Sequence, residues 1–282
     1  MKLPAFEYAA PATLAEAVQL LAANSGSKAL AGGQSLIPTM AFRLASPPML
    51  VDLGKIQGLS EIDISSRGIA LGARVRWRDI EDDRRLATAH PLLVEAISHV
   101  AHYQIRNRGT VGGSLAHADP AAEMPGIAVV CDAEIIVLNS QRKHVIPAGK
   151  FFTGPLSTVL ADDELIVEVR LPAWPAARRW AFEEFARRRG DFALAGVAVF
   201  YDLLEGRANN VHIGVIGACT RPHRVPRAEN TLSGRPLNAA AISEAAAALV
   251  EALDPPSDLH ASAAYRRALA GTLLERALRR TL

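Results

Sequence analysis

Cysteine is scarce in this sequence. The chain has only two, Cys131 and Cys219, and they form no C-x-x-C pair. Because an iron–sulfur cluster needs several thiolate ligands, the chain cannot hold a cysteine-ligated cluster by itself. Two isolated cysteines also give no disulfide framework, which predicts a reducing compartment and a cytoplasmic protein.

Long apolar runs and a surplus of charge are also missing. No stretch reaches the roughly 18 consecutive apolar residues of a membrane-spanning helix, and residues 1–6 lack the apolar core of a secretory signal peptide. The net charge is only +2, whereas a nucleic-acid-binding protein normally has a clustered basic face. We therefore expect no membrane span and no nucleic-acid partner.

The sequence does have ample apolar residues for a core. It is 282 residues long and 50% hydrophobic, which suits about two domains on length alone. Strand-like and helical patterns both occur, which predicts an α+β fold. Two prolines within residues 172–175 indicate the clearest boundary. We divide the chain into units of residues 1–56, 57–173 and 174–282.

The strongest local signal is a capping box of Thr13 and Glu16, which predicts a helix within residues 11–24. Pro91 suits the first turn of another helix. Alternating segments around residues 65–68 and around residues 205–207 predict two hairpins. Further strands are expected at 28–30, 49–53, 134–138, 144–146, 165–171 and 180–185, and further helices at 36–43, 77–80, 238–253 and 259–281. The third unit is predicted to hold three strands and about three helices.

Two glycine-rich stretches carry most of the functional information. Residues 30–36 read Leu-Ala-Gly-Gly-Gln-Ser-Leu, and residues 106–120 contain a second adjacent glycine pair followed by serine, histidine and aspartate. Backbone N–H groups in glycine turns can approach an anion closely, so two such turns suit the two phosphates of a dinucleotide. Neither is a Rossmann fingerprint or a P-loop, and each pair alone is also what an ordinary loop contains.

Polar side chains follow the second glycine pair. A metal site is disfavoured, because His117 and Asp119 have no third ligand nearby in the sequence. Hydrogen bonding to a polyol or diphosphate fits better, and Glu123 could accept from ribose or ribityl hydroxyls. The alternative is that Asp119 caps a helix with Pro120 in its first turn. Both interpretations stay open, and one residue can serve both roles.

Taken together, residues 30–38 and 110–123 resemble the FAD-binding medium subunit of molybdenum hydroxylases, the carbon monoxide dehydrogenase and xanthine dehydrogenase family. Residues 188–193, 227–234 and 265–269 are similar to that family as well. The resemblance covers nearly the whole chain. It implies a two-part FAD-binding domain of the vanillyl-alcohol-oxidase (PCMH) type, followed by a smaller C-terminal domain of antiparallel sheet and helices.

The resemblance also implies which residues hold a non-covalent FAD. Both glycine stretches would hold the diphosphate, Glu123 stands where the family has an acidic residue on the ribityl chain, and Ala101 and Ile166 lie in segments like those that line the flavin. Redox chemistry belongs to the cofactor, so no catalytic side chain and no metal ligand is named. The expected FAD-binding residues are Ala31, Gly32, Gly33, Gln34, Ser35, Leu36, Ala101, Thr110, Gly112, Gly113, Ser114, His117, Asp119, Glu123 and Ile166.

Two positions depart from the family pattern. Ser114 stands where the family often has asparagine, and a hydroxyl offers fewer hydrogen-bonding sites than an amide. Glu183 stands where some relatives have lysine, which puts an NAD-type electron acceptor in doubt.

The resemblance implies a subunit that relays electrons to an external acceptor. The implied partners are a small subunit with [2Fe–2S] clusters and a large molybdopterin subunit, assembled as a dimer of heterotrimers. The substrate and the acceptor are set outside this chain. Two other functions stay open: a self-contained flavin-dependent oxidase, and an assembly scaffold that keeps the fold without the flavin.

Overall fold

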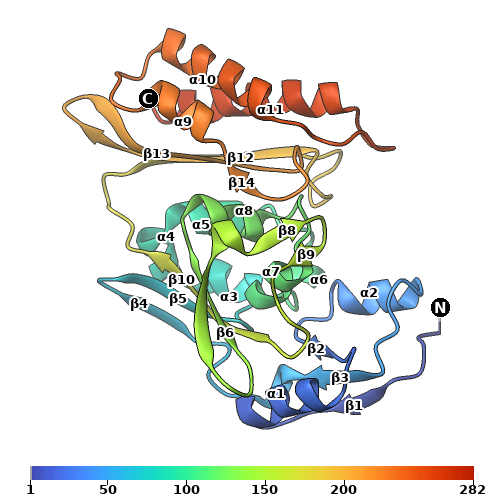
Figure 1. Cartoon of the computed structure of the whole chain (residues 1–282). Coiled ribbons are helices and arrows are strands. Elements are labelled where there is room, and N and C mark those ends of the chain that lie inside the picture. The colour runs from blue at the N-terminus through green and yellow to red at the C-terminus, as the bar shows by residue number, and fades with distance from the viewer. Residues whose placement is uncertain (1) are drawn as a thin grey trace.

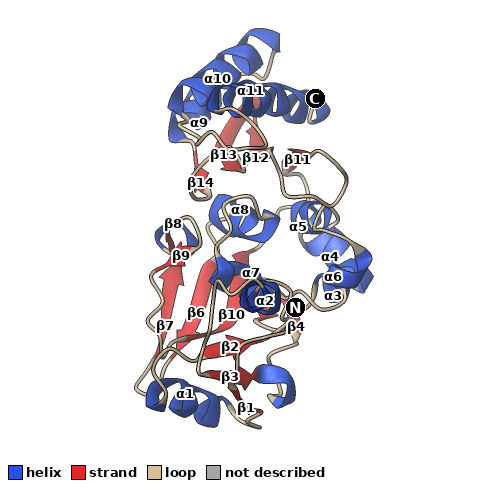
Figure 2. Cartoon of the chain, turned by 90° about the vertical axis from the view of Figure 1, so that its right-hand side faces the viewer, coloured by secondary structure: helices blue, strands red, loops and turns tan. Residues whose placement is uncertain are grey.

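The computed structural model describes residues 2–282. In Figure 1 the chain rises from a small N-terminal unit, through a central sheet with helices above it, to a second layer of sheet and helices at the C-terminal end. Figure 2 shows the same order from the side, with strands at all three levels. The predicted mixture of helix and sheet is confirmed.

The N-terminal unit contains a three-stranded parallel sheet in the order β1-β3-β2. Strands β1 (Glu7–Ala9) and β2 (Lys28–Leu30) both pair with the central β3 (Met49–Asp52). In the register of β2 and β3, Leu30 lies opposite Asp52. Both strands therefore end at the same edge of the sheet.

The helices of this unit follow the sequence signals. Helix α1 (Leu14–Ala23) begins at the predicted capping box: the Thr13 hydroxyl accepts from the Glu16 backbone N–H, and the Glu16 carboxylate accepts from the backbone N–H of Thr13. Helix α2 (Leu36–Ala41) starts where it was predicted but ends two residues early.

The central sheet has five antiparallel strands in the order β4-β5-β10-β6-β7. The hairpin predicted around residues 65–68 is confirmed: residues 62–65 pair antiparallel with residues 68–71. One face of the sheet packs on α1 and β3, and the other packs on the helical layer. The strands are β4 (Ile62–Ser65), β5 (Gly68–Gly72), β6 (Glu134–Leu138), β7 (Lys143–Pro147) and β10 (Leu165–Pro172).

The helical layer holds more helices than the sequence predicted. The glycine-rich residues 111–117, predicted as a turn, form helix α7, because the Thr110 hydroxyl accepts from the Gly113 N–H and caps the helix. Helices α4 and α6 were not predicted either, and a helix near α8 was expected only in the alternative in which Asp119 caps it. The layer consists of α3 (Trp77–Asp82), α4 (Arg84–Ala89), α5 (Pro91–Ile97), α6 (Tyr103–Arg106), α7 (Val111–His117) and α8 (Glu123–Val130).

The C-terminal unit is an antiparallel sheet in the order β11-β12-β13-β14 with three helices. It has four strands, not the predicted three, because a two-residue strand, β14, adds to the edge. Residues 195–201 of β12 are all buried, since the helical layer covers one face and α9–α11 the other. The elements are β11 (Arg179–Phe185), β12 (Ala195–Leu204), β13 (Arg207–Ile216), β14 (His223–Arg224), α9 (Pro226–Leu232), α10 (Ala239–Ala252) and α11 (Ala263–Arg280).

Four short elements complete the chain. They are the 3-10 helices at Leu53–Lys55 and Ala148–Lys150 and the strand pair β8 (Phe152–Gly154) and β9 (Ser157–Thr158). Within residues 2–282, no helix combines the length and apolar character needed to cross a membrane.

Candidate functional site

The first glycine turn lies at the carboxyl edge of the small parallel sheet. It leaves β2 after Leu30, and Gly33 has a φ of +72°, a conformation that favours glycine. The turn is closed by the Gln34 side-chain amide, which donates to the Gly32 carbonyl at 3.2 Å. Strand β3 ends beside it at Asp52. The carboxyl ends of parallel strands are where open α/β sheets commonly bind ligands.

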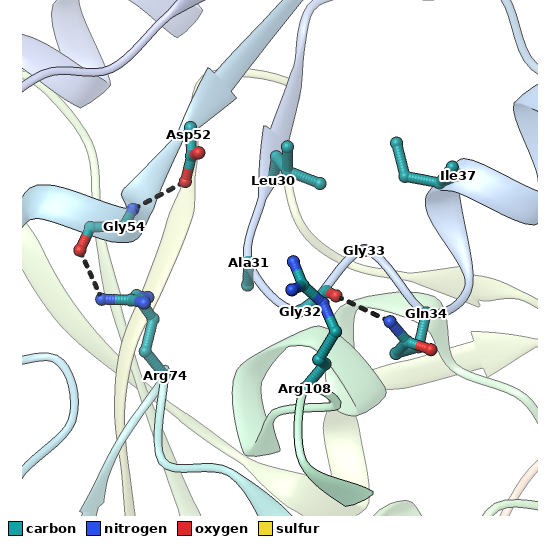
Figure 3. Close-up of a pocket in the computed structure, with 10 residues that line it drawn as sticks. All are labelled: Leu30, Ala31, Gly32, Gly33, Gln34, Ile37, Asp52, Gly54, Arg74 and Arg108. Atoms are coloured by element: carbon teal, nitrogen blue, oxygen red, sulfur yellow. Dashed lines mark hydrogen bonds between the residues drawn. The ribbon is translucent and has the colours of Figure 1, made fainter. Parts of the chain in front are cut away.

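A cavity of about 390 Å³ opens over this turn (Figure 3), and a second of about 150 Å³ shares part of its wall. The shared residues are Ala31, Gly32, Arg74 and Arg108. Of the sequence-predicted site residues, Ala31, Gly32, Gly33 and Gln34 line the larger cavity, and Thr110 lines the smaller one. The larger cavity is lined further by Leu30, Ile37, Asp52 and Gly54, and the smaller one by Arg76 and Asn107.

The arginines of this wall are held in place by backbone pairing. Residues 73–77, which follow β5, run antiparallel to residues 109–112, with backbone hydrogen bonds of 2.8, 2.9 and 3.2 Å between them. Because side chains alternate along an extended segment, Arg74 and Arg76 project to one side while their neighbours are buried in the core. Arg108 precedes the second segment. Figure 3 shows Arg108 extending toward the glycine turn and Arg74 extending toward Gly54, to which it is hydrogen-bonded.

Gly32 brings the turn against the second glycine stretch. A Cβ atom at Gly32 would lie 2.1 Å from the Arg108 carbonyl oxygen and 3.0 Å from the Gly109 Cα. Any side chain there would force the two segments apart. The two glycine stretches thus meet at Gly32 and residues 108–109.

The charges around the cavities are unevenly paired. Arg76 pairs with Asp79 at 2.7 Å and Arg106 with Glu81 at 3.0 Å. Within residues 2–282, by contrast, Arg74 and Arg108 have no carboxylate partner. Arg74 donates to the Gly54 carbonyl at 3.0 Å, and its buried Nε has no hydrogen-bond partner.

The other predicted residues of the first stretch flank the turn. Ser35 is the N-cap residue of α2, but its side chain makes no capping hydrogen bond, and Leu36 is the first helical residue. Neither lines a cavity.

The second glycine pair lies inside α7. A Cβ at Gly112 would be 2.7 Å from the Ala73 Cβ, so this glycine allows α7 to pack on the end of β5. Gly113 donates its N–H to the Thr110 hydroxyl at 3.2 Å. Ser114 and His117 lie further along α7 and line neither cavity.

Asp119 and Glu123 belong to the loop after α7 and to the start of α8. The Asp119 carboxylate accepts from the Ala121 N–H at 2.8 Å, whereas α8 has Ala122 as its N-cap residue without a side-chain hydrogen bond. Asp119 therefore closes the loop and does not cap α8 directly. Pro120 in the same loop accepts from Gly217 at 2.9 Å, which ties the loop to the C-terminal sheet.

Glu123 is buried, and a partly buried carboxyl, Glu184 on β11, lies close enough to sense its charge. Burial raises the pKa of both groups; the charge of Asp119 adds to the rise at Glu123, and the charge of Glu123 adds to the rise at Glu184. One oxygen of Glu184 is buried without a hydrogen-bond partner. These two carboxyls favour the protonated state more than exposed glutamates do.

The last two predicted residues lie apart from the cavities. Ala101, in the loop between α5 and α6, has a φ of +40°, and Arg106 holds this loop by donating to the carbonyls of Val100 and Ala101 at 3.0 Å each. Ile166 is buried in the core of β10. Neither lines a cavity wall.

The sequence analysis missed four charged residues of the cavity walls: Arg74, Arg76, Arg108 and Asp52. The alternation of arginine with apolar residues in 73–78 was a usable signal, because it predicts an extended segment with all its arginines on one side. For the other two residues the sequence offers only their position: Arg108 directly precedes a glycine, and Asp52 is the last residue of a strand.

Two family models together cover nearly the whole chain. Residues 4–174 match the FAD binding domain in molybdopterin dehydrogenase, and residues 180–281 match the CO dehydrogenase flavoprotein C-terminal domain.

Individual proteins show the same similarity. The nicotine 6-hydroxylase medium subunit of Paenarthrobacter nicotinovorans is 41% identical over 99% of this chain and 98% of its own length. The 6-hydroxypseudooxynicotine dehydrogenase complex subunit alpha of the same organism is 39% identical over 100% of this chain and 96% of its own. Among solved structures, carbon monoxide dehydrogenase from Hydrogenophaga pseudoflava matches 100% of this chain and 98% of its own chain, with a TM-score of 0.97 and 35% identity.

Proposed function

The chain belongs to the FAD-binding medium-subunit family of molybdenum hydroxylases, and from this premise we propose that it holds FAD non-covalently and relays electrons between partner subunits and an external acceptor. The family is one of oxidoreductases. When bound, FAD supplies the redox chemistry, because a flavin can receive electrons singly and give up two.

The observation that carries this proposal is the pair of cavities over the first glycine turn. Their wall combines the closely approached backbone of Gly32 with two arginines that lack carboxylate partners. A dinucleotide carries two phosphates, and arginine is suited to phosphate by its planar set of N–H donors. The residues present therefore fit the diphosphate of FAD.

The remaining predicted residues are part of the same proposal. We assign Thr110, Gly112 and Gly113 to the second side of the cofactor site, and Glu123 to a hydroxyl of the cofactor. Ala31, Gln34, Ser35, Leu36, Ser114, His117, Asp119, Ala101 and Ile166 complete the proposed set. We also propose the domain bounds 1–56, 57–173 and 174–282, which separate the three larger sheets.

The names of the relatives support the proposed assembly. Several are named as medium subunits or chains of hydroxylases and dehydrogenases. We propose that this chain likewise joins a small subunit with [2Fe–2S] clusters and a large molybdopterin subunit, as a dimer of heterotrimers in the cytoplasm. Since the cofactor that acts on the substrate would lie in the large subunit, the substrates in the relatives' names are not assigned to this chain.

The experiment is to purify the tagged full chain from its native cells and to analyse what comes with it. We expect two further subunits and a flavin, iron and molybdenum content of about one, four and one per set of three chains, given two [2Fe–2S] clusters. Reducing the complex with its substrate without air should bleach the flavin absorbance. A chain that purifies alone and oxidises a substrate by itself would indicate a self-contained oxidase. A complex without flavin would indicate a scaffold.

A further inference from the structure

We propose that Arg74 and Arg108 form a clamp that ion-pairs with the diphosphate of the bound dinucleotide over the backbone of Gly32. This inference rests on the proposed FAD function and adds to it two residues that the sequence patterns did not indicate. It makes phosphate recognition depend on side-chain charge as well as on the glycine backbone.

The first support is that these two cations lack carboxylate partners. Arginines in this part of the chain are commonly paired: Arg76, Arg78 and Arg106 all contact carboxylates at 2.7–3.0 Å. Arg74 and Arg108, the two that line both cavities, have none among residues 2–282. A buried donor without a partner is costly, and the Arg74 Nε is such a donor. An anion in the cavity would pair with the charge of the same guanidinium group.

The second support is the distribution of charge along the two cavities. The smaller cavity is lined by three arginines and no carboxylate, and one of the three, Arg76, is already bound to Asp79. The larger cavity contains one carboxylate, Asp52, whose oxygens accept from the Gly54 N–H at 2.7 Å and from the Tyr8 hydroxyl. The net positive end is therefore the wall that the two cavities share, where Gly32, Arg74 and Arg108 meet.

The third support is that both arginines are positioned by rigid backbone. Arg74 lies in the segment that pairs with residues 109–112, and its Nη1 donates to the Gly54 carbonyl at 3.0 Å. The Arg108 carbonyl lies against Gly32. Both side chains therefore extend from the two segments that define the site. Binding of an anion between the two guanidinium groups then requires little rearrangement of the backbone.

The test compares Arg74→Gln and Arg108→Gln with a matched control, Arg84→Gln. Arg84 is an exposed arginine of α4 that lines neither cavity, and its replacement changes the net charge by the same amount. The full-length chain, freed of cofactor, is titrated with FAD and with riboflavin, which has no phosphate. Flavin fluorescence reports binding of both, and each titration is repeated at several salt concentrations.

We expect each clamp variant to weaken FAD binding by about tenfold to a hundredfold, as loss of a charged hydrogen bond implies. Riboflavin affinity should be the same in all variants, and the salt dependence of FAD binding should decrease only in the clamp variants. FAD binding by both clamp variants that equals the control would overturn the inference. So would an equal loss of riboflavin affinity, because that would indicate a merely structural role.

Inorganic pyrophosphate separates this inference from the proposed function. If the wild-type chain binds no FAD, either alone or with its partner subunits present, the proposed function fails, and the clamp is then judged by pyrophosphate alone. Pyrophosphate that raises the melting temperature of the wild type and the Arg84 variant, but not of the clamp variants, supports the clamp. No rise in the wild type rejects it. Arg108→Gln is the safer variant for folding, because Arg108 is exposed and its side chain makes no hydrogen bond within the described chain.

Discussion

Replacing Gly32 by alanine tests the meeting point of the two glycine stretches. The added Cβ would lie 2.1 Å from the Arg108 carbonyl oxygen, 2.8 Å from its carbonyl carbon and 3.0 Å from the Gly109 Cα. All three are backbone atoms, and residues 109–112 are hydrogen-bonded to residues 73–77, so they cannot give way cheaply. Forcing an extra carbon into packed structure costs about 1–3 kcal/mol, or roughly 2–10 °C in melting temperature for a chain of this size.

The same substitution separates the turn from the arginine wall. We therefore expect Gly32→Ala to weaken FAD binding by more than about tenfold in addition to lowering the melting temperature. The matched control is Gly149→Ala, because a Cβ at Gly149 meets nothing within 4 Å. Both variants are compared by thermal melting and by FAD titration. A Gly32 variant that melts and binds FAD like the Gly149 variant would refute the reasoning.

Two further predictions concern buried groups. Because burial raises the pKa of Glu184, the unfolded chain binds fewer protons above pH ~4.3, and this group makes the fold less stable as pH rises. Glu184→Gln removes this pH dependence. Between pH 5 and pH 8, the free energy of unfolding measured with urea should therefore rise by about 1 kcal/mol or more in the variant relative to the wild type. A difference between the two proteins that does not change with pH would contradict this. Thr110→Ala removes the cap on Gly113 and should cost about 1 kcal/mol, whereas Thr110→Ser should keep it. Equal melting temperatures of the Thr110→Ala and Thr110→Ser variants would contradict the assigned cap.

Local signals predicted the fold well where one interaction decides the structure. The Thr13–Glu16 capping box marked α1, and the turn residues 205–207 marked the β12–β13 hairpin, because each signal lies within a few residues of its effect. The glycine-rich residues 111–117 were misread as a turn. Glycine disfavours helix by about 1 kcal/mol per residue, but here the lack of a side chain allows α7 to pack against Ala73, a contact that sequence spacing does not show.

The candidate site was predictable only on its backbone side. Adjacent glycines identified the turn at Gly32 and Gly33, since they show where a chain can approach an anion. The arginine side depends on the pairing of residues 73–77 with residues 109–112, which are far apart in the sequence. Arg74 and Arg108 line the same cavities only because that pairing brings the two segments together, so no local pattern could join them to the turn.

The most direct measurement is the visible absorption spectrum of the purified full-length chain before and after addition of FAD, with thermal melting alongside. The account predicts a protein-bound flavin spectrum and a higher melting temperature, since a ligand at a hundredfold excess over its Kd stabilises the folded state by about 2.7 kcal/mol. A chain that stays colourless and melts unchanged, both alone and in the presence of its partner subunits, would contradict the claim that it carries FAD.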